Sequence, residues 1–306
     1  MLLRLGSVPT LVASSSEAAQ EILKTHDLSL SSRPNSPILE ALLYGCKDLA
    51  FAPSGEFWKQ LKSVVVTHLL STTQVKSFQS VREKEIGQLI HVLGESYGSS
   101  VDISALLFSL AEKIVCTVAI GRTYDGLKLT SLLKTYLSMF TRLSVGSYIP
   151  SLSWVDRLTG LMGSAEKVTK EFDEFLEDII EEHAKGELER NDERQDFIDI
   201  LLNVQKDNTA GFTLKRDTIK AVILDIFGGG IDSASTNMEW VLSELVRNPR
   251  VMKKLQKEIT EVARGRSPIV EEDLESPTLK PLLKRVYDYI LQSRFFFLIN
   301  QHKMSN

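Results

Sequence analysis

Cysteine and histidine are scarce in this 306-residue sequence, and each scarcity removes a class of protein. The two cysteines, Cys46 and Cys116, lie far apart, so neither a disulfide framework nor a zinc site is indicated. A reducing compartment is therefore predicted. Neither thiol has a nearby base or an electropositive setting, so both are expected to be core or surface residues and not nucleophiles. The five histidines are scattered without a second ligand at metal spacing, so no metal site is expected.

Long apolar runs are also missing. No stretch approaches the roughly 18 continuous apolar residues that span a bilayer, and residues 1–7 are too short and too soon polar for a signal peptide. Any membrane contact is therefore expected to be weak and peripheral. One candidate is the stretch 148–155, where Ile149 and Trp154 flank a proline. Packing of this stretch under neighbouring helices is the alternative.

Basic and acidic residues are nearly balanced. The 36 Lys and Arg residues stand against 40 Asp and Glu residues, the formal net charge is −4, and no dense basic block stands out. Nucleic-acid binding is therefore not expected. The sequence shows no internal repeat and no long Pro/Gly/Ser-rich linker, which favours a single domain.

The apolar residues that are present recur mainly at three- and four-residue spacing, which predicts a mainly α fold. The clearest helix is predicted over residues 164–183, with a solvated connector over 185–195 after it. A shorter helix is expected over 196–204. A long helix is expected from about Leu214 to Arg247, and it is apolar on more than one face, a pattern typical of a helix that is buried on all sides in a complete fold.

The N-terminus departs from the helical period. Residues 3–5 and 8–12 flank Gly6-Ser7 and predict a small β hairpin. The serines at 14–16, followed by Glu17, then predict a capped helix that ends near His26.

Three consecutive glycines interrupt the long predicted helix, at a cost of about 1 kcal/mol each relative to alanine. Gly229 and Gly230 are followed by Asp232 and Ser233. A local opening of the helix there would admit a ligand and hold water beside the acid and the hydroxyl, which could relay protons to a bound oxygen species. Alternatively, the helix ends at Gly228, turns, and restarts with Asp232 or Ser233 as N-cap. A phosphate-binding loop is excluded because no strand precedes the glycines and no Gly-Lys-Ser/Thr follows them.

A second candidate site is formed by Trp58 and Lys62, which lie four residues apart and so share a helix face. An indole N–H and an ammonium group on one face could together bind a carboxylate. The alternative is a core tryptophan beside a lysine whose charged end reaches solvent.

Taken together, these segments resemble the plant microsomal, A-type branch of the cytochrome P-450 family over about residues 2–286. The family's motifs occur in the family's order, and they are Leu28-Ser-Leu-Ser-Ser-Arg-Pro34, Ala50-Phe-Ala-Pro53, Trp58-Lys-Gln-Leu-Lys62, Ser80-Val-Arg-Glu83, Ile114-Val-Cys116, Gly121-Arg-Thr-Tyr124 and residues 227–252. The resemblance implies a mainly α, partial cytochrome P-450 fold over residues 1–286, with a small N-terminal hairpin and a divergent tail over 287–306.

The resemblance also implies roles for the two candidate sites. Trp58 and Lys62 match the family's Trp-x-x-x-Arg/Lys pattern, whose members contact the haem propionates. Gly229, Gly230, Asp232 and Ser233 fall in the family's oxygen-activating motif, in which Ile231 and Ser233 replace two usual threonines.

The departures from the family concern the iron ligand. The haem-binding loop Phe-x-x-Gly-x-Arg-x-Cys-x-Gly is not found among the 306 residues, and Cys46 and Cys116 have Tyr44 and Ile114 where that loop has arginine. The residues 279–286 resemble the start of the next conserved helix, but Asp288 and Leu291 stand where its Glu-x-x-Arg pair is expected. The family's membrane anchor would precede Met1.

The function that the resemblance implies is haem-dependent monooxygenation of a small lipophilic plant secondary metabolite, with electrons from a flavoprotein NADPH reductase. Without the cysteine loop this chain is expected to be catalytically inactive. The family lies on the cytosolic face of the endoplasmic reticulum membrane, and without the anchor the chain is expected to be cytosolic or peripheral. The alternative is a non-catalytic helical remnant that binds a full-length relative.

Overall fold

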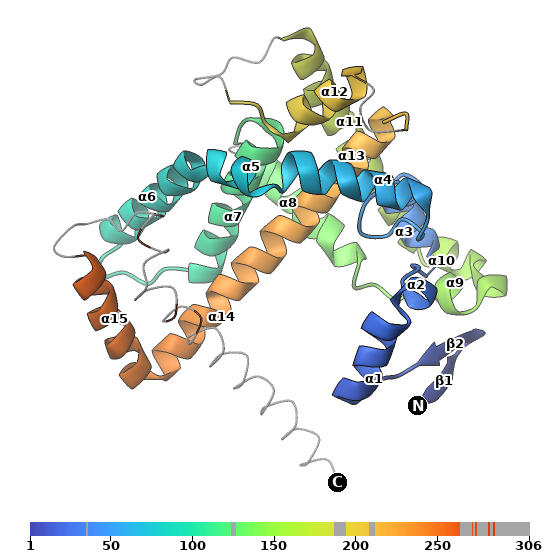
Figure 1. Cartoon of the computed structure of the whole chain (residues 1–306), viewed down its shortest axis with the longest axis horizontal. Helices are drawn as coiled ribbons and strands as arrows, with labels where there is room; N and C mark the ends of the chain where they lie inside the picture. Colours follow the sequence, from blue (N-terminus) through green and yellow to red (C-terminus); the bar gives the residue numbers. More distant parts are fainter. Residues whose placement is uncertain are drawn as a thin grey trace. The chain divides into compact units, whose positions relative to one another are not determined.

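The computed structural model describes residues 1–34, 36–123, 127–186, 194–207 and 212–263, together with 271, 273, 281 and 284 (Figure 1). These residues are mainly helical with one two-stranded sheet, which confirms the predicted fold class. Tyr124, most of the predicted connector, most of the 279–286 segment and the whole tail lie outside the described residues.

The described elements follow one another along the chain with mostly short connections. Their bounds are β1 Leu2–Leu5, β2 Val8–Leu11, α1 Ser16–Gln20, η1 Glu21–Thr25, α2 Asp27–Leu30, α3 Pro37–Leu42, α4 Glu56–Val64, η2 Val65–Leu69, α5 Thr72–Ser77, α6 Gln79–Glu95, α7 Ile103–Ile120, α8 Leu127–Met139, α9 Val145–Tyr148, η3 Pro150–Leu152, α10 Trp154–Leu158, α11 Leu161–Lys185, α12 Phe197–Asp207, α13 Arg216–Phe227, η4 Gly228–Asp232, α14 Ser233–Arg247 and α15 Pro249–Ala263.

The elements group into two compact units. Unit 1 contains residues 1–76 and 115–229, and unit 2 contains residues 77–114 and 230–306. Neither unit is one continuous stretch of sequence, and α7 contributes to both. The expectation of one domain over residues 1–286 stays a prediction.

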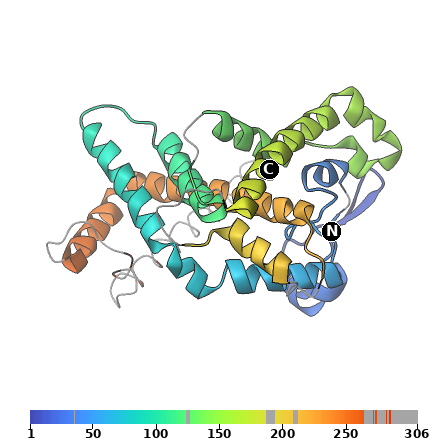
Figure 2. The same ribbon diagram turned by 90° about the horizontal axis from the view of Figure 1, so that it is seen from above.

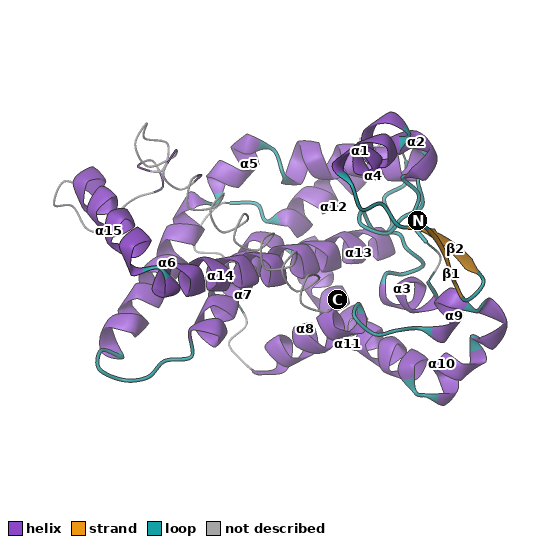
Figure 3. Ribbon diagram, turned by 90° about the horizontal axis from the view of Figure 1, so that it is seen from below, coloured by secondary structure: helices purple, strands orange, loops and turns teal. Residues whose placement is uncertain are grey.

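The predicted hairpin is present in unit 1, with Leu2 opposite Leu11 and Leu5 opposite Val8. Gly6 has a φ of +65°, which suits the first position of a two-residue hairpin turn. The turn lies against α9, because the backbone N–H of Ser7 donates to the carbonyl of Tyr148 at 2.8 Å (Figure 3). A Cβ at position 6 would lie 2.4 Å from that carbonyl oxygen, so only glycine fits. The capped helix after the hairpin is also confirmed, with Ser15 accepting from the N–H of Ala18.

Helix α11 is the centre of the unit 1 core. It contains the helix predicted over residues 164–183 and packs against α3, α8, α12 and α13. Phe172, near the middle of its buried face, belongs to an aromatic cluster in which the centre of the Tyr136 ring lies 5.3 Å from that of Phe172 and 5.1 Å from that of Phe140. Seen from above, α12 lies beside both α13 and the α4–η2 segment (Figure 2).

Helix α13 is buried along almost its whole length, as expected for the first part of the long predicted helix. Its ionisable side chains are therefore paired with other elements. Lys220, whose side chain is only 5% exposed, donates to Asp173 at 2.5 Å and lies 2.7 Å from Glu177, both on α11. Asp217 accepts from Lys47 at 2.8 Å.

A left-handed turn precedes Lys47. Tyr44, Gly45 and Cys46 have φ values of 53°, 76° and 55° in succession. In residues other than glycine, a positive φ costs about 1 to 3 kcal/mol per residue. The surrounding contacts must therefore hold this turn in place. One of these contacts is the Lys220 ammonium, which lies 6.0 Å from the Tyr44 ring.

Unit 2 contains α6, the first part of α7, α14 and α15. Helices α6 and α7 face each other across a cavity of about 110 Å³ lined by Glu85 and Lys113 among others. Arg82 of α6 forms a two-pronged ion pair with Glu271 at 2.7 and 2.9 Å. Helices α14 and α15 share a small apolar cluster around Leu245 and Leu255.

The second part of the long helix is covered on fewer sides than the first part. In the described chain, Trp240, Leu242 and Val246 of α14 are exposed, Val246 to 70%. No segment long and apolar enough to span a bilayer was expected from the sequence. By length and composition, however, helix α7 could cross a membrane. Its central Glu112 and Lys113 interrupt the apolar run, and a core helix passes the same test.

We predict that Lys220→Ala lowers the free energy of unfolding by about 2 kcal/mol, measured by urea denaturation. Breaking a fully buried ion pair costs about 3 to 5 kcal/mol, and the cost is smaller here because both carboxylates keep partial access to water. Lys170→Ala is the matched control, since Lys170 pairs with Glu174 on the exposed face of α11. It should cost less than about 0.5 kcal/mol. Equal losses of unfolding free energy in the two variants would contradict a stabilising role for the buried Lys220 ion pairs.

Candidate functional site

The glycine segment forms a π-helical turn over Gly228–Asp232, between α13 and α14. Gly228 and Asp232 both have right-handed helical dihedral angles, and the Asp232 side chain makes no capping hydrogen bond. The alternative of a helix that stops, turns and restarts at an N-cap is therefore wrong. The helical backbone continues through a widened turn, as the hypothesis of a local opening requires. Single π turns inside α-helices occur frequently at functional sites.

The glycine turn leaves room beside the backbone. A Cβ added at Gly229 would meet no described atom within 4 Å, and one added at Gly228 would only touch Leu137 and Tyr136 at 3.8 and 3.9 Å. Within unit 1, neighbouring side chains therefore do not require glycine at positions 228 and 229, and the backbone at Gly229 is open to the close approach of a ligand. Asp232 and Ser233, which follow directly, are both exposed.

The second predicted site lies on α4, and the structure places Trp58 and Lys62 on one face as expected. The Lys62 ammonium lies 4.8 Å from the centre of the Trp58 ring, which is a cation–π distance. The Trp58 indole N–H, however, donates to the carbonyl of Leu49 at 2.9 Å. To bind a carboxylate, the indole would have to exchange this backbone partner for the ligand, whereas Lys62 is already available.

The loop that receives the Trp58 bond is fixed by a residue that the sequence analysis missed. One oxygen of Asp225, on α13, accepts hydrogen bonds from the backbone N–H groups of both Leu49 and Ala50, at 2.7 and 3.1 Å. Asp225 is one of the few ionisable residues in the otherwise apolar first half of the long helix. A carboxyl group buried in such an apolar run needs a hydrogen-bond partner. Its position in the sequence could therefore have marked Asp225 as a residue that contacts another element.

Neither cysteine has the properties of a metal-binding thiolate. Burial, followed by the charges of Asp48 and Glu40, raises the pKa of Cys46 to about 11, so its thiol stays protonated at neutral pH. Cys116 is 1% exposed in the interior of α7. Both are therefore structural residues, as the sequence analysis predicted for a core or surface position.

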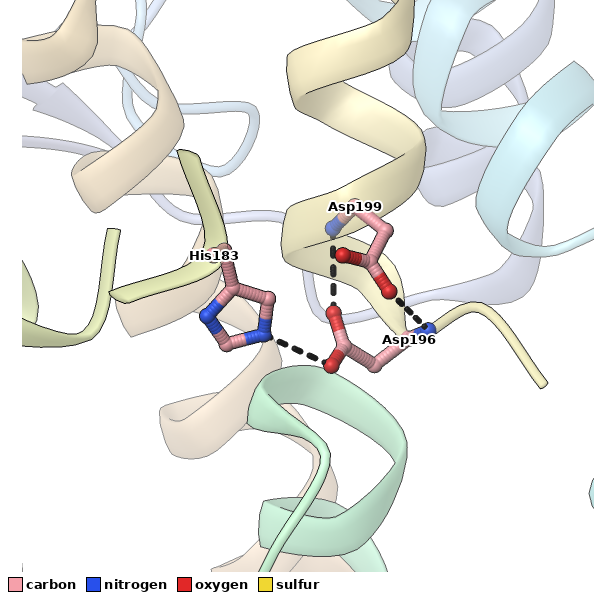
Figure 4. A group of neighbouring side chains, drawn as sticks. All are labelled: His183, Asp196 and Asp199. Carbon is pink, nitrogen blue, oxygen red and sulfur yellow. Dashed lines mark hydrogen bonds and ion pairs between the residues drawn. The ribbon is translucent and has the colours of Figure 1, made fainter. Parts of the chain in front are cut away.

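His183 lies in a group that resembles a metal site in composition but not in chemistry. Its ligand atom and those of Asp196 and Asp199 lie within 4.8 Å of one another (Figure 4). The imidazole Nδ1 is 2.7 Å from the carbonyl of Ile179, which can only accept, and Nε2 is 2.8 Å from Asp196. Asp196 and Asp199 each accept the backbone N–H of the other, as in a capping arrangement at the start of α12. The group therefore acts as an ion pair that joins α11 to the start of α12.

The protonation of His183 follows from these contacts. Burial lowers the pKa of the imidazolium, but the hydrogen bond and charge of Asp196 and the bond to Ile179 outweigh burial and raise it. With both ring nitrogens donating, neither keeps a lone pair for a metal ion.

The comparisons with known proteins agree with the fold and the motifs. The family model described as Cytochrome P-450 matches residues 1–283. The chain is 69% identical over 285 residues to "Cytochrome P-450 Tp4149" of Tanacetum parthenium, covering 93% of this chain and 57% of that protein. It is 46% identical over 288 residues to "3-beta-hydroxylase" of Tanacetum parthenium, covering 93% and 58%. It is 43% identical over 276 residues to "Cytochrome P-450 71A23" of Arabidopsis thaliana, covering 90% and 56%.

Two solved structures share the fold. A zebrafish cytochrome P-450 with progesterone matches with a TM-score of 0.78 and 22% identity, over 95% of this chain and 67% of that one. A second structure of a zebrafish cytochrome P-450, with abiraterone, matches with a TM-score of 0.76, also at 22% identity, over 94% and 64%. The chain spans little more than half the length of the curated relatives it matches.

We predict that the ion pair of His183 stabilises unit 1 in a pH-dependent way. Because the pKa of His183 is raised in the folded chain, its contribution is complete below the ordinary value of about 6.5 and is lost as pH rises through the raised value. The stability difference between the wild type and His183→Gln, measured by urea denaturation, should therefore be largest near pH 6 and shrink toward pH 9. A gain in melting temperature on adding Zn²⁺ that His183→Gln abolishes would instead indicate a metal site.

Proposed function

The chain belongs to the cytochrome P-450 family, and from this membership we propose that it carries the oxygen-activating helix and propionate-binding region of a plant haem monooxygenase. The proposed substrates are small lipophilic secondary metabolites. The observation that carries the proposal is the widened turn over Gly228–Asp232, with open space at Gly229 and exposed Asp232 and Ser233 directly after it. The curated relatives include one named for a hydroxylase and one named an oxidase, which supports this reaction class.

The residues proposed to hold haem lie on two elements. The Lys62 ammonium and the Trp58 indole N–H would bind propionate oxygens, and Gly229 with Gly230 would let the macrocycle approach the helix backbone. When bound through an iron ligand, haem supplies the activation of molecular oxygen, with electrons proposed to come from a flavoprotein NADPH reductase.

Asp232 and Ser233 are proposed to move protons. A carboxylate and a hydroxyl that are both exposed beside a widened helical turn can hold water in a hydrogen-bonded line. Ser233 provides the hydroxyl where the family commonly has threonine, so a proton donor is retained although a methyl group is lost. Ile231, at the other substituted position, is buried and cannot contribute to such a line.

The family's cysteine loop, which would provide the iron ligand, does not occur in these 306 residues. Cys116 is buried within α7, and the raised pKa of Cys46 opposes a thiolate. We infer that this polypeptide by itself does not form the haem–thiolate centre and is catalytically inactive. The alternative of a helical remnant that binds a full-length relative stays a prediction.

Location at the cytosolic face of the endoplasmic reticulum is proposed from the family, with weak contact between the chain and the lipid surface. The stretch 148–155 forms α9, η3 and the start of α10. Ile149 packs under the hairpin, since a Cβ at Gly6 would lie 2.7 Å from its Cγ1. Trp154 and Leu158 are 55% and 77% exposed. These two side chains, and not Ile149, are the proposed lipid contacts.

We predict that replacing both Trp154 and Leu158 with serine lowers co-sedimentation with phosphatidylcholine vesicles by about tenfold or more. Burying one large apolar side chain is worth about 1.5 to 3 kcal/mol, and two such losses exceed the 1.4 kcal/mol of a tenfold change. Val246→Ser is the matched control, since Val246 is similarly exposed but lies on α14 of unit 2. Vesicle binding that the double substitution leaves unchanged would exclude this surface.

We predict that the purified chain reconstituted with hemin, reduced and exposed to carbon monoxide lacks the red-shifted Soret band of a cysteinate ligand. Hemin binding itself should weaken in Lys62→Ala, because a charge-assisted bond to a propionate is lost. Lys59→Ala on the same helix serves as the control. A stoichiometric thiolate band that disappears in Cys46→Ala or Cys116→Ala would overturn the proposed inactivity.

A further inference from the structure

Two carboxyl groups meet beside the loop that leads to α4, and both belong to unit 1. Asp225 projects from α13, and one of its oxygens accepts the N–H groups of Leu49 and Ala50. Asp48 is 0% exposed, and its Oδ2 accepts the N–H of Phe51 at 2.8 Å. Because Asp225 bonds the backbone of the two residues that directly follow Asp48, the two carboxyl groups are neighbours.

The hydrogen-bonding oxygens of these two carboxyl groups can all be satisfied only if one of the groups carries a proton. Ionised carboxylates only accept, so two of them cannot bond to each other. Asp48 Oδ1 is buried, and no donor from the described part of the protein reaches it. A proton on the second oxygen of Asp225 would supply that donor, while its first oxygen keeps both backbone bonds. One proton therefore satisfies an acceptor that is otherwise costly to bury.

The surroundings favour this shared proton. Tyr136, on α8, is 1% exposed, and burial, then the charges of Asp225 and Asp48, raises its pKa well above the ordinary value. Cys46 faces Asp48 from the left-handed turn, and burial, followed by the charge of Asp48, raises the pKa of its thiol to about 11. The other charged side chain at the loop, Arg33, donates to the carbonyl of Ala50 at 2.6 Å. Burial, followed by the charge of Asp48, raises the pKa of Asp225 to about 8.

The pair acts on the segment that receives the Trp58 indole. Both N–H groups of Leu49 and Ala50 bond to Asp225, the Leu49 carbonyl accepts from Trp58, and the Ala50 carbonyl accepts from Arg33. Four bonds thus fix one dipeptide, and two of them come from the same carboxyl oxygen. Loss of that oxygen would release the dipeptide and, with it, the acceptor that orients the indole.

We propose that Asp225 and Asp48 share one proton, and that this proton-linked pair is a positioning device that holds the Leu49–Ala50 segment and thereby orients Trp58. The consequence for haem propionate binding rests on the proposed function. The sharing of the proton and the positioning of Trp58 do not.

The pH dependence follows from the direction of the shift. An acid whose pKa is raised on folding binds a proton more tightly in the folded chain than in the unfolded chain. Its favourable contribution is complete below the ordinary value of about 4 and is lost as pH rises through about 8. Above that pH two adjacent negative charges repel each other.

Asp225→Asn tests the shared proton, because the amide oxygen can accept the two backbone bonds while the amide N–H₂ group donates to Asp48. Denaturant midpoints should be similar in the wild type and this variant near pH 5, and the variant should become the more stable protein near pH 9. Asp217→Asn on the same helix is the matched control. Since Lys47 lowers the pKa of Asp217, its loss should destabilise about equally at both pH values, with no crossing. Parallel profiles for Asp225→Asn and the wild type would overturn the proposal.

The positioning of Trp58 is measured without haem, by fluorescence in a background where Trp154 and Trp240 are phenylalanine. Asp225→Ala should shift the Trp58 emission to longer wavelength and speed amide exchange at Leu49 and Ala50 by about tenfold or more, as loss of a net hydrogen bond implies. Asp225→Asn should do neither. If Asp225→Ala is too unstable to purify, Asp225→Leu in the same assay replaces it. Unchanged emission and exchange in the apolar variant would overturn the positioning role.

Hemin titration of the same variants separates this inference from the proposed function. If hemin binds the wild type and its affinity falls about tenfold in Asp225→Ala but not in Asp225→Asn, both proposals are supported. Absence of hemin binding to any variant counts against the proposed function alone, and the fluorescence and exchange results still decide this inference.

Discussion

The structure of unit 1 depends on how helix α13 keeps charged groups inside an apolar environment. Eight of its residues are buried, among them Lys220, and Asp217 and Asp225 lie on the same helix. Each of these groups would lose its hydration on folding, so each must gain a partner from another element. The partners come from α11, from the left-handed turn region and from the loop before α4. The positions of these three segments are therefore coupled to one helix through polar bonds and not only through packing.

This coupling explains why an otherwise expensive loop conformation persists. Three residues in succession adopt positive φ values before Lys47, and two of them are not glycine. The residues that follow the turn are fixed to α13, by Lys47 bonding Asp217 and by the backbone of Leu49 and Ala50 bonding Asp225. The strain of the turn is offset because the contacts after it could not form with a relaxed backbone.

Much of the fold could be predicted because it is encoded locally. The three- and four-residue spacing of Val168, Phe172, Leu176 and Ile179 identified α11, and the apolar residues on either side of Gly6-Ser7 identified the hairpin. The long helix was found, but the glycines allowed either a stop or a widened turn, and only the backbone geometry of the structure distinguishes them. The sequence shows that α14 carries apolar side chains on several faces, but it does not show which neighbours cover them, and the structure leaves Trp240, Leu242 and Val246 exposed.

The candidate site was predictable only where its residues lie close in sequence. The shared face of Trp58 and Lys62 follows from their spacing, but the bond from Trp58 to Leu49 depends on a loop conformation that spacing does not fix. Asp48 and Asp225 are separated by most of the chain, so no local pattern could join them. An isolated acid within an apolar helix shows that a partner exists, without showing which residue it is.

The π turn at Gly228–Asp232 also has a consequence for how this helix can change by insertion and deletion. A π turn accommodates one more residue than an α-helical turn, so it is equivalent to a single-residue insertion absorbed without breaking the helix. Removing one glycine would restore α-helical winding while Ser233 and the residues after it keep nearly their present orientation, because four residues of an α-helix turn the chain through about the same angle as the five of this turn. Adding or removing a residue within the regular part of α13 would instead rotate every following side chain by about 100° around the helix axis. The glycine turn is therefore the place where the length of this helix can change without changing which side chains α14 presents.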